Sequence, residues 1–368
     1  MLPENTNGYC LALTQSGATI VQLRAAKEIS ALAVTFLSDI QTEKQWKQSG
    51  RALYDAILAP IPNIGRYERL TIVPDGNLHL VPFESLLSAS GTLVGQTSIV
   101  SYAPSAVSNF FLKSRPGLQS AKSFLGVGGA VYDEAATKSF TLAKSTARGA
   151  YLGVDLAKLP NLPGSLEEVK TAAEILRPVK GDAVLQIGDG ATEFAFTHAP
   201  LATFQVVHLA IHAMADKNDP SRAALIFPPD PQHSDDRLLE PRDIVGLHLG
   251  AQVVVLSACD TAVGRLQGQV GVANLARAFL QAGADSVIST LWQVSDVYSS
   301  YLMKAFYGYL ARGDTAATAL TLAKRDMLRA SDGNLSPRLW AGFILVGNGD
   351  AALQTSQEVV TRSAIRVQ

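Results

Sequence analysis

Between residues 122 and 292, short apolar runs alternate with stretches that have the periodicity of amphipathic helices. Three of the runs are apolar almost throughout, which is typical of parallel strands buried on both faces; they are FQVVHLAIHA (204–213), QVVVLSA (252–258) and DSVISTLW (285–292). The segment SLEEVKTAAEIL (165–176) opens with a capping-box pair, Ser165 and Glu168, and is expected to form a helix. This alternation predicts an α/β fold with a mostly parallel sheet flanked by helices.

The residues before 122 predict a less regular half. A hairpin is expected over residues 9–23, two helices over 25–58, and a second hairpin over 69–81 with its turn at Pro74-Asp75-Gly76. Residues 113–122 are polar and contain glycine and proline, which is typical of a boundary between domains. We therefore expect an amino-terminal half at 1–118, a second half at 119–352 and a carboxyl-terminal tail at 353–368.

Composition excludes several classes of partner. Charged residues make up 17% of the chain, the net charge is −1, and no block of lysine and arginine suggests binding to nucleic acid or to an anionic membrane. The chain has two cysteines, no signal peptide at its start, and no apolar run of the ~18–20 residues that a membrane helix needs. The glycines of GVGGAVY (126–132) lack the spacing of a dinucleotide loop. We expect a soluble cytoplasmic protein without a cofactor.

Two of the predicted strands end in reactive side chains, His212 and Cys259. The carboxyl ends of parallel strands meet at one edge of a sheet, where ligands and catalytic groups gather. An imidazole beside a thiol favours the thiolate, which is the nucleophilic form of cysteine. The pattern is consistent with a Cys/His dyad, and equally with a buried cysteine that has no chemical role.

Several motifs together resemble the CHAT family of caspase-like cysteine peptidases, relatives of separase. They are HLAIHA, LSACDTAVG, GVANLARAFLQAGADSVISTLWQVSD and PRLWAGFILVGNG, preceded by LTIVPDGNLHLVPFESL and VSYAPSA. The resemblance implies a caspase-like fold, catalysis by His212 and Cys259 through a thioester, and no metal or cofactor. It places the oxyanion against the backbone N–H groups of Ala213 and Cys259.

The sequence departs from the family pattern at two positions. The family usually has glycine after the histidine, where this chain has Ala213, and its Gly-Glu-Gly segment is replaced by Gln269-Val270-Gly271. A methyl group at position 213 crowds the oxyanion site unless φ is negative there.

Acidic residues near the expected cleft have two interpretations each. Asp296 is either the N-cap of the helix that follows it or, by resemblance, a wall of the pocket for a basic residue before the cut. Asp260 either contacts substrate or forms a turn with Thr261, and Asp216 is a weaker candidate. His208 and His212 are expected on one strand, ~13 Å apart, which is too far for a shared metal ion.

The sequence therefore predicts a cysteine endopeptidase that cleaves a specific protein substrate and is regulated by a partner protein or a fused sensor domain. Relatives of this kind include enzymes of bacterial antiphage defence. The alternative is a catalytically inert module that keeps the fold and binds a protein or peptide.

Overall fold

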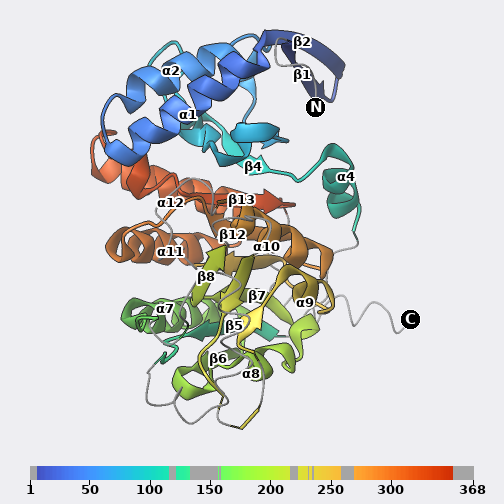
Figure 1. Ribbon diagram of the computed structural model, residues 1–368, viewed down its shortest axis with the longest axis vertical. Helices are drawn as coiled ribbons and strands as arrows, with labels where there is room; N and C mark the ends of the chain where they lie inside the picture. The colour runs from blue at the N-terminus through green and yellow to red at the C-terminus, as the bar shows by residue number, and fades with distance from the viewer. Residues whose placement is uncertain are drawn as a thin grey trace.

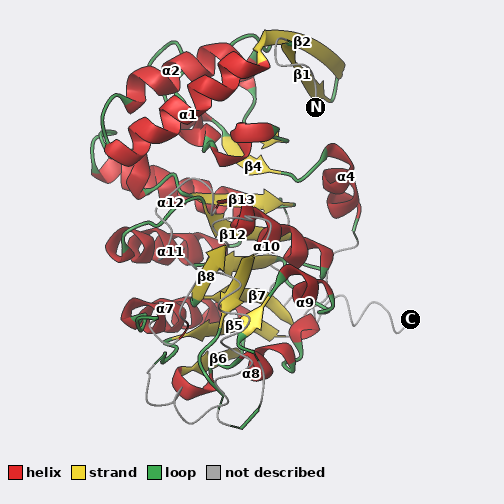
Figure 2. Cartoon of the chain, in the orientation of Figure 1, coloured by secondary structure: helices red, strands yellow, loops and turns green. Residues whose placement is uncertain are grey.

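The computed structural model describes residues 6–115, 122–132, 156, 159–215, 223–230, 232–233, 236–257 and 269–350 (Figure 1). Within this part of the chain, helices cover both sides of a central sheet, and further helices and a hairpin lie at one end (Figure 2). None of the described helices is both long and apolar enough to cross a bilayer.

The central sheet has eight strands, and all neighbours are parallel except β12 and β13. In spatial order the strands are β3 (Arg69–Ile72), β4 (Ile99–Tyr102), β13 (Phe343–Gly347), β12 (Ser286–Thr290), β11 (Val253–Leu256), β7 (Phe204–Leu209), β5 (Lys122–Gly128) and β6 (Ala183–Ile187). This arrangement confirms the predicted α/β fold. The expected halves, 1–118 and 119–352, both contribute strands to this one sheet, and their boundary stays a prediction.

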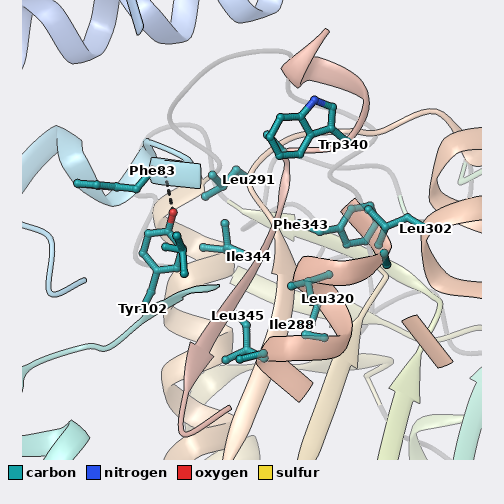
Figure 3. Packing of buried hydrophobic residues seen from close by; sticks show 14 of the residues in the cluster. Phe83, Tyr102, Ile288, Leu291, Leu302, Leu320, Trp340, Phe343, Ile344 and Leu345 are labelled. Atoms are coloured by element: carbon teal, nitrogen blue, oxygen red, sulfur yellow. Dashed lines mark hydrogen bonds between the residues drawn. The ribbon is translucent and has the colours of Figure 1, made fainter. Parts of the chain in front are cut away.

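Side chains alternate between the two faces of the sheet, and both faces are buried. In β11, Val253 and Val255 belong to one apolar core, while Val254 and Leu256 belong to the other. The first core packs beneath α7 (Pro163–Lys180), α11 (Asp296–Ala311) and α12 (Ala316–Ala330). The second packs beneath α8 (Glu193–Thr197), α9 (Pro241–Val245) and α10 (Gln269–Gln281). Two covered faces explain why the strand sequences show no polar alternation. Figure 3 shows the alternation on β13, where Phe343 and Ile344 point to opposite sides of the strand.

The amino-terminal segment begins with the expected hairpin, β1 (Asn7–Thr14) and β2 (Gly17–Ala25), followed by α1 (Ala26–Thr42) and α2 (Trp46–Ile57). The hairpin expected over 69–81 is wrong. After β3 the chain forms a 3-10 helix, η2 (Gly76–Leu80), and β3 pairs instead with the parallel strand β4. Gly76 has a φ of +53°, and the Asp75 carboxylate accepts its N–H at 2.9 Å, so the Pro-Asp-Gly turn leads into η2 rather than into a second strand. Two short helices follow, α3 (Val94–Thr97) and α4 (Ala106–Ser114).

The strand expected over 204–213 divides in two. β7 ends at Leu209, and the Ala210 N–H donates to the Val127 carbonyl at 2.8 Å as the chain leaves the sheet. His212 then opens β8 (His212–Ala215), which joins β9 (Ala223–Ile226) and β10 (Leu238–Leu239) in a separate antiparallel sheet. The break was hidden in the sequence because both sheets are buried, so HLAIHA is apolar across the junction.

Two helix starts also differ from expectation. α7 begins at Pro163, and Ser165 lies in its first turn instead of capping it. Its hydroxyl donates to the Leu162 carbonyl at 2.7 Å and accepts the Gly129 N–H at 2.8 Å, which ties the helix to the end of β5. α11 has Ser295 as its N-cap, and Asp296 is its first residue. The prediction that Asp296 caps this helix is therefore wrong.

Candidate active site

The candidate site begins at the carboxyl ends of β7 and β11, which are neighbouring parallel strands. Leu209 lies opposite Leu256, and the Ser257 N–H donates to the Leu209 carbonyl at 3.1 Å. His212 comes three residues after Leu209, and Cys259 three residues after Leu256. The described parts of both segments, up to His212 and Ser257, therefore lie after the same edge of the sheet. Cys259, Asp260 and Asp216 themselves lie outside the described residues.

The imidazole of His212 is buried and held by a backbone carbonyl. Its Nε2 lies 2.8 Å from the carbonyl oxygen of Pro160. A carbonyl can only accept, so the neutral ring carries its proton on Nε2 and a lone pair on Nδ1. Burial lowers the pKa of His212, and the hydrogen bond to Pro160 partly opposes that change. The ring is therefore mainly neutral at pH 7.

Tyr132 supports this histidine and was not identified from the sequence. The two ring centroids are 4.7 Å apart with planes inclined at 61°, an edge-to-face contact. The tyrosine hydroxyl donates to the Ile226 carbonyl at 2.7 Å. It also accepts a hydrogen bond from the backbone N–H of His212 at 3.4 Å. The Tyr132 N–H donates to the Asn161 side-chain oxygen at 2.7 Å, one residue beyond Pro160. Burial raises the pKa of Tyr132, so the hydroxyl keeps its proton. Tyr132 belongs to the GVGGAVY segment, where the sequence pattern concerns the glycines and gives no sign of a role for the tyrosine.

Ala213 is accommodated without backbone strain. It lies in β8 opposite Leu225, and it is absent from the described non-glycine residues with positive φ. An extended backbone tolerates a methyl group, so the replacement of the usual glycine does not itself disturb the fold. The assignment of the Ala213 N–H to an oxyanion site stays a prediction.

Asp296 lies exposed at the start of α11 and faces the start of α7. A Cβ placed on Gly164 would lie 3.7 Å from its Oδ2 atom. Nearby in sequence, Trp292 is half-buried, and its indole N–H donates to the Arg338 carbonyl at 2.8 Å while the ring packs against Gly342. The predicted contact between Asp296 and a substrate stays untested.

His208 is a hydrogen-bonded core residue, as predicted. Its Nδ1 is 2.8 Å from the Tyr307 hydroxyl, and its Nε2 is 3.1 Å from Glu168 Oε1. It belongs to β7, whereas His212 belongs to β8, so the two imidazoles occupy different sheets. Across the described residues, no three His, Cys, Asp or Glu side chains are grouped so that they could hold a metal ion.

Comparison with known proteins assigns the family. The CHAT domain model matches residues 47–348, most of the chain. The chain belongs to the CHAT domain family. Tetratricopeptide repeat protein 28 of Homo sapiens is 26% identical to this CHAT chain over 360 residues, and its Mus musculus counterpart is 26% identical over 368 residues. Each alignment covers 86% of this chain but 14% of the relative, so the chain spans about a seventh of the curated proteins that it matches.

Two solved structures resemble the CHAT chain at low sequence identity. The Arg-specific cysteine proteinase gingipain R aligns with a TM-score of 0.48 and 9% identity, over 90% of this chain and 71% of that one. Separase, from the separase–securin complex of Saccharomyces cerevisiae, aligns with a TM-score of 0.39 and 13% identity, over 73% of this chain and 14% of that one.

Proposed function

We propose that this CHAT chain is a cysteine endopeptidase whose nucleophile is Cys259 and whose base is His212. The observation that carries the proposal is the hydrogen bond from His212 Nε2 to the Pro160 carbonyl, at 2.8 Å. This bond fixes the tautomer in which Nδ1 can accept the proton of a thiol. The register of β7 and β11 supports the pairing, because both segments leave the sheet from opposed residues.

In the proposed reaction, His212 Nδ1 takes the thiol proton and the Cys259 sulfur attacks the scissile carbonyl carbon. The tetrahedral oxyanion is stabilised by the N–H groups of Ala213 and Cys259. The imidazolium then donates its proton to the leaving amine, and a thioester remains on Cys259. Water then attacks the thioester as His212 takes one of its protons, the carbon–sulfur bond breaks, and His212 passes that proton to the Cys259 sulfur as the acid product leaves. Every step uses groups of the protein and water, without a cofactor.

We further propose that Asp296 selects a basic residue before the scissile bond. Its carboxylate is exposed at the start of α11, where it is available to the guanidinium or ammonium of a substrate. Asp260, directly after the nucleophile, is proposed to contact the substrate backbone. The substrate is a specific protein, and a partner protein regulates cleavage. Both relatives are named for the tetratricopeptide repeat, a helical repeat. We therefore propose that the regulator is a repeat protein or a fused repeat domain.

A peptidyl chloromethylketone with arginine at its reactive end tests the nucleophile. The chain has one other cysteine, Cys10, which provides a matched control because it is half-buried in β1 at the far end of the molecule. We expect labelling of the wild type and of Cys10→Ala, none of Cys259→Ala, and slow labelling of His212→Ala. A folded wild type that resists the reagent, alone and with cell lysate as a source of activators, contradicts the enzyme and indicates an inert binding module.

Cleavage of a peptide library tests the specificity. We expect arginine or lysine before the cut in the wild type and a loss of that preference in Asp296→Asn, with cleavage of other peptides retained. A wild-type profile without basic residues at this position removes Asp296 from the proposed pocket and leaves the dyad proposal intact.

A further inference from the structure

A cavity lies between η2 and α10, against the ends of β12 and β13. Its floor is formed by Ser289 and Leu291 at the end of β12 and by Ile344 and Val346 of β13. Ser289 is paired with Ile344, so these side chains share one face of the sheet. The volume is about 140 Å³. A well-studied engineered protein cavity of about 150 Å³ accommodates benzene, so a ligand here would have roughly six non-hydrogen atoms.

The rim of the cavity is polar and positively charged. Arg277 of α10 and His79 of η2 line it, together with Asn274 of α10. Burial lowers the pKa of His79, and the charge of Arg277 lowers it further, while Asp75 acts in the opposite direction. The described lining contains no acidic residue, and no described carboxylate lies within 4.0 Å of the Arg277 guanidinium. Arg277 and His79 therefore lie near each other at the rim of a cavity that no described acidic residue lines.

We propose that this cavity binds a small branched organic carboxylate. The carboxylate accepts hydrogen bonds from the Arg277 guanidinium and from the His79 ring, and its negative charge is opposite to that of Arg277. The alkyl part packs on Leu291 and Ile344, in the combination of apolar surface and few directed polar groups that small-molecule sites share. A neutral ligand of the same shape leaves the positive rim uncompensated, and an inorganic anion leaves the apolar floor uncovered.

Because the cavity lies between η2 and α10, a bound ligand contacts two parts of the chain that are far apart in sequence. η2 belongs to the amino-terminal segment, in the motif VPDGNLHLVPFESL, whereas α10 is the first described helix after residues 258–268, which include Cys259. A ligand that contacts both stabilises their association, because binding to the folded state alone raises its stability. The proposal concerns binding and does not depend on catalysis by Cys259.

Isovalerate is the probe, and isovaleramide is its neutral counterpart of the same shape. We expect isovalerate to bind the wild type saturably in a calorimetric titration, with a Kd on the order of 1 mM for so small a ligand. The amide should bind at least about tenfold more weakly, because it lacks the charge that Arg277 recognises. In a parallel NMR titration, the imidazole signals of His79 should shift with isovalerate and shift much less with isovaleramide at the same concentration.

Arg277→Gln tests the assigned residue, and Arg66→Gln is its control, since Arg66 is exposed in the amino-terminal segment and does not line the cavity. We expect isovalerate affinity to fall about tenfold or more in Arg277→Gln and to stay unchanged in Arg66→Gln. Three results overturn the proposal: no saturable binding to the wild type, equal binding of acid and amide, or an unchanged Kd in Arg277→Gln. The NMR titration of the wild type decides the matter if that variant does not fold.

Discussion

Replacing Lys324 with methionine is expected to cost a large part of the stability of this protein. The Lys324 ammonium donates to the Glu84 carboxylate and to the Phe343 carbonyl, and the Tyr102 hydroxyl donates to the other Glu84 oxygen at 2.6 Å. The side chains of Lys324 and Glu84 are only 7% and 5% exposed. Tyr102 also accepts the Phe83 N–H at 2.8 Å, a contact drawn in Figure 3. The group joins α12 to the amino-terminal segment.

The magnitude follows from which charge is left behind. Methionine fills the volume of the lysine stem, but Glu84 stays buried without its counter-charge, and breaking a buried pair in this way costs about 3–5 kcal/mol. Removing both charges, in Glu84→Gln with Lys324→Met, leaves hydrogen-bonding groups but no isolated charge. The double variant should therefore lose less than the two single variants added together.

Urea unfolding monitored by circular dichroism measures all four proteins of this cycle. Lys304→Met on the exposed side of α11 is the control, and it should change the free energy of unfolding by no more than about 0.5 kcal/mol. A loss below about 1 kcal/mol in Lys324→Met, the range of exposed ion pairs, would refute the reasoning. So would single-variant losses that simply add.

Two further substitutions test other parts of the structure. In Tyr132→Phe, the His212 N–H and the Ile226 carbonyl lose their shared partner, so we expect a loss of about 1–3 kcal/mol in urea unfolding and slower labelling of Cys259; unchanged values for both contradict the supporting role. Burial raises the pKa of Asp285 from 3.8 to about 6 against the opposing charge of Arg115. The folded state therefore holds this proton more tightly than the unfolded state, and the resulting stability is complete below pH 4 and lost as pH rises through 6, to a limit of roughly 3 kcal/mol. Asp285→Asn should remove that part of the pH dependence of unfolding, and an identical pH profile in both proteins excludes the effect.

The regular part of the fold could be predicted because its signal is local. β7, β11 and β12 are buried on both faces, and continuous apolar runs follow directly from that. The positions of His212 and Cys259 after two such strands also follow from the sequence, since parallel strands end at one edge. That β7 and β11 are direct neighbours, with Leu209 opposite Leu256, could not be predicted from the sequence and is seen only in the fold.

Other features depend on residues far apart in the chain. At the break between β7 and β8, the Ala210 N–H donates to the Val127 carbonyl. Val127 belongs to β5, some eighty positions earlier in the chain. Pro160 and Tyr132 both contact His212, but neither lies in a sequence motif that predicts this contact. The pairing of Glu84 with Lys324 spans 240 positions, and each looks like an ordinary charged residue in its own segment.

The register of the central sheet has a mechanical consequence. Between β4 and β13 only Val346 and Tyr102 are aligned as partners, whereas β12 and β13 are aligned over five residues. A pull on the amino-terminal segment therefore meets a single aligned pair between these two strands, together with the Lys324–Glu84 and Arg69–Asp350 ion pairs. Under load we expect the strands of this sheet to separate first between β4 and β13, where the register is shortest.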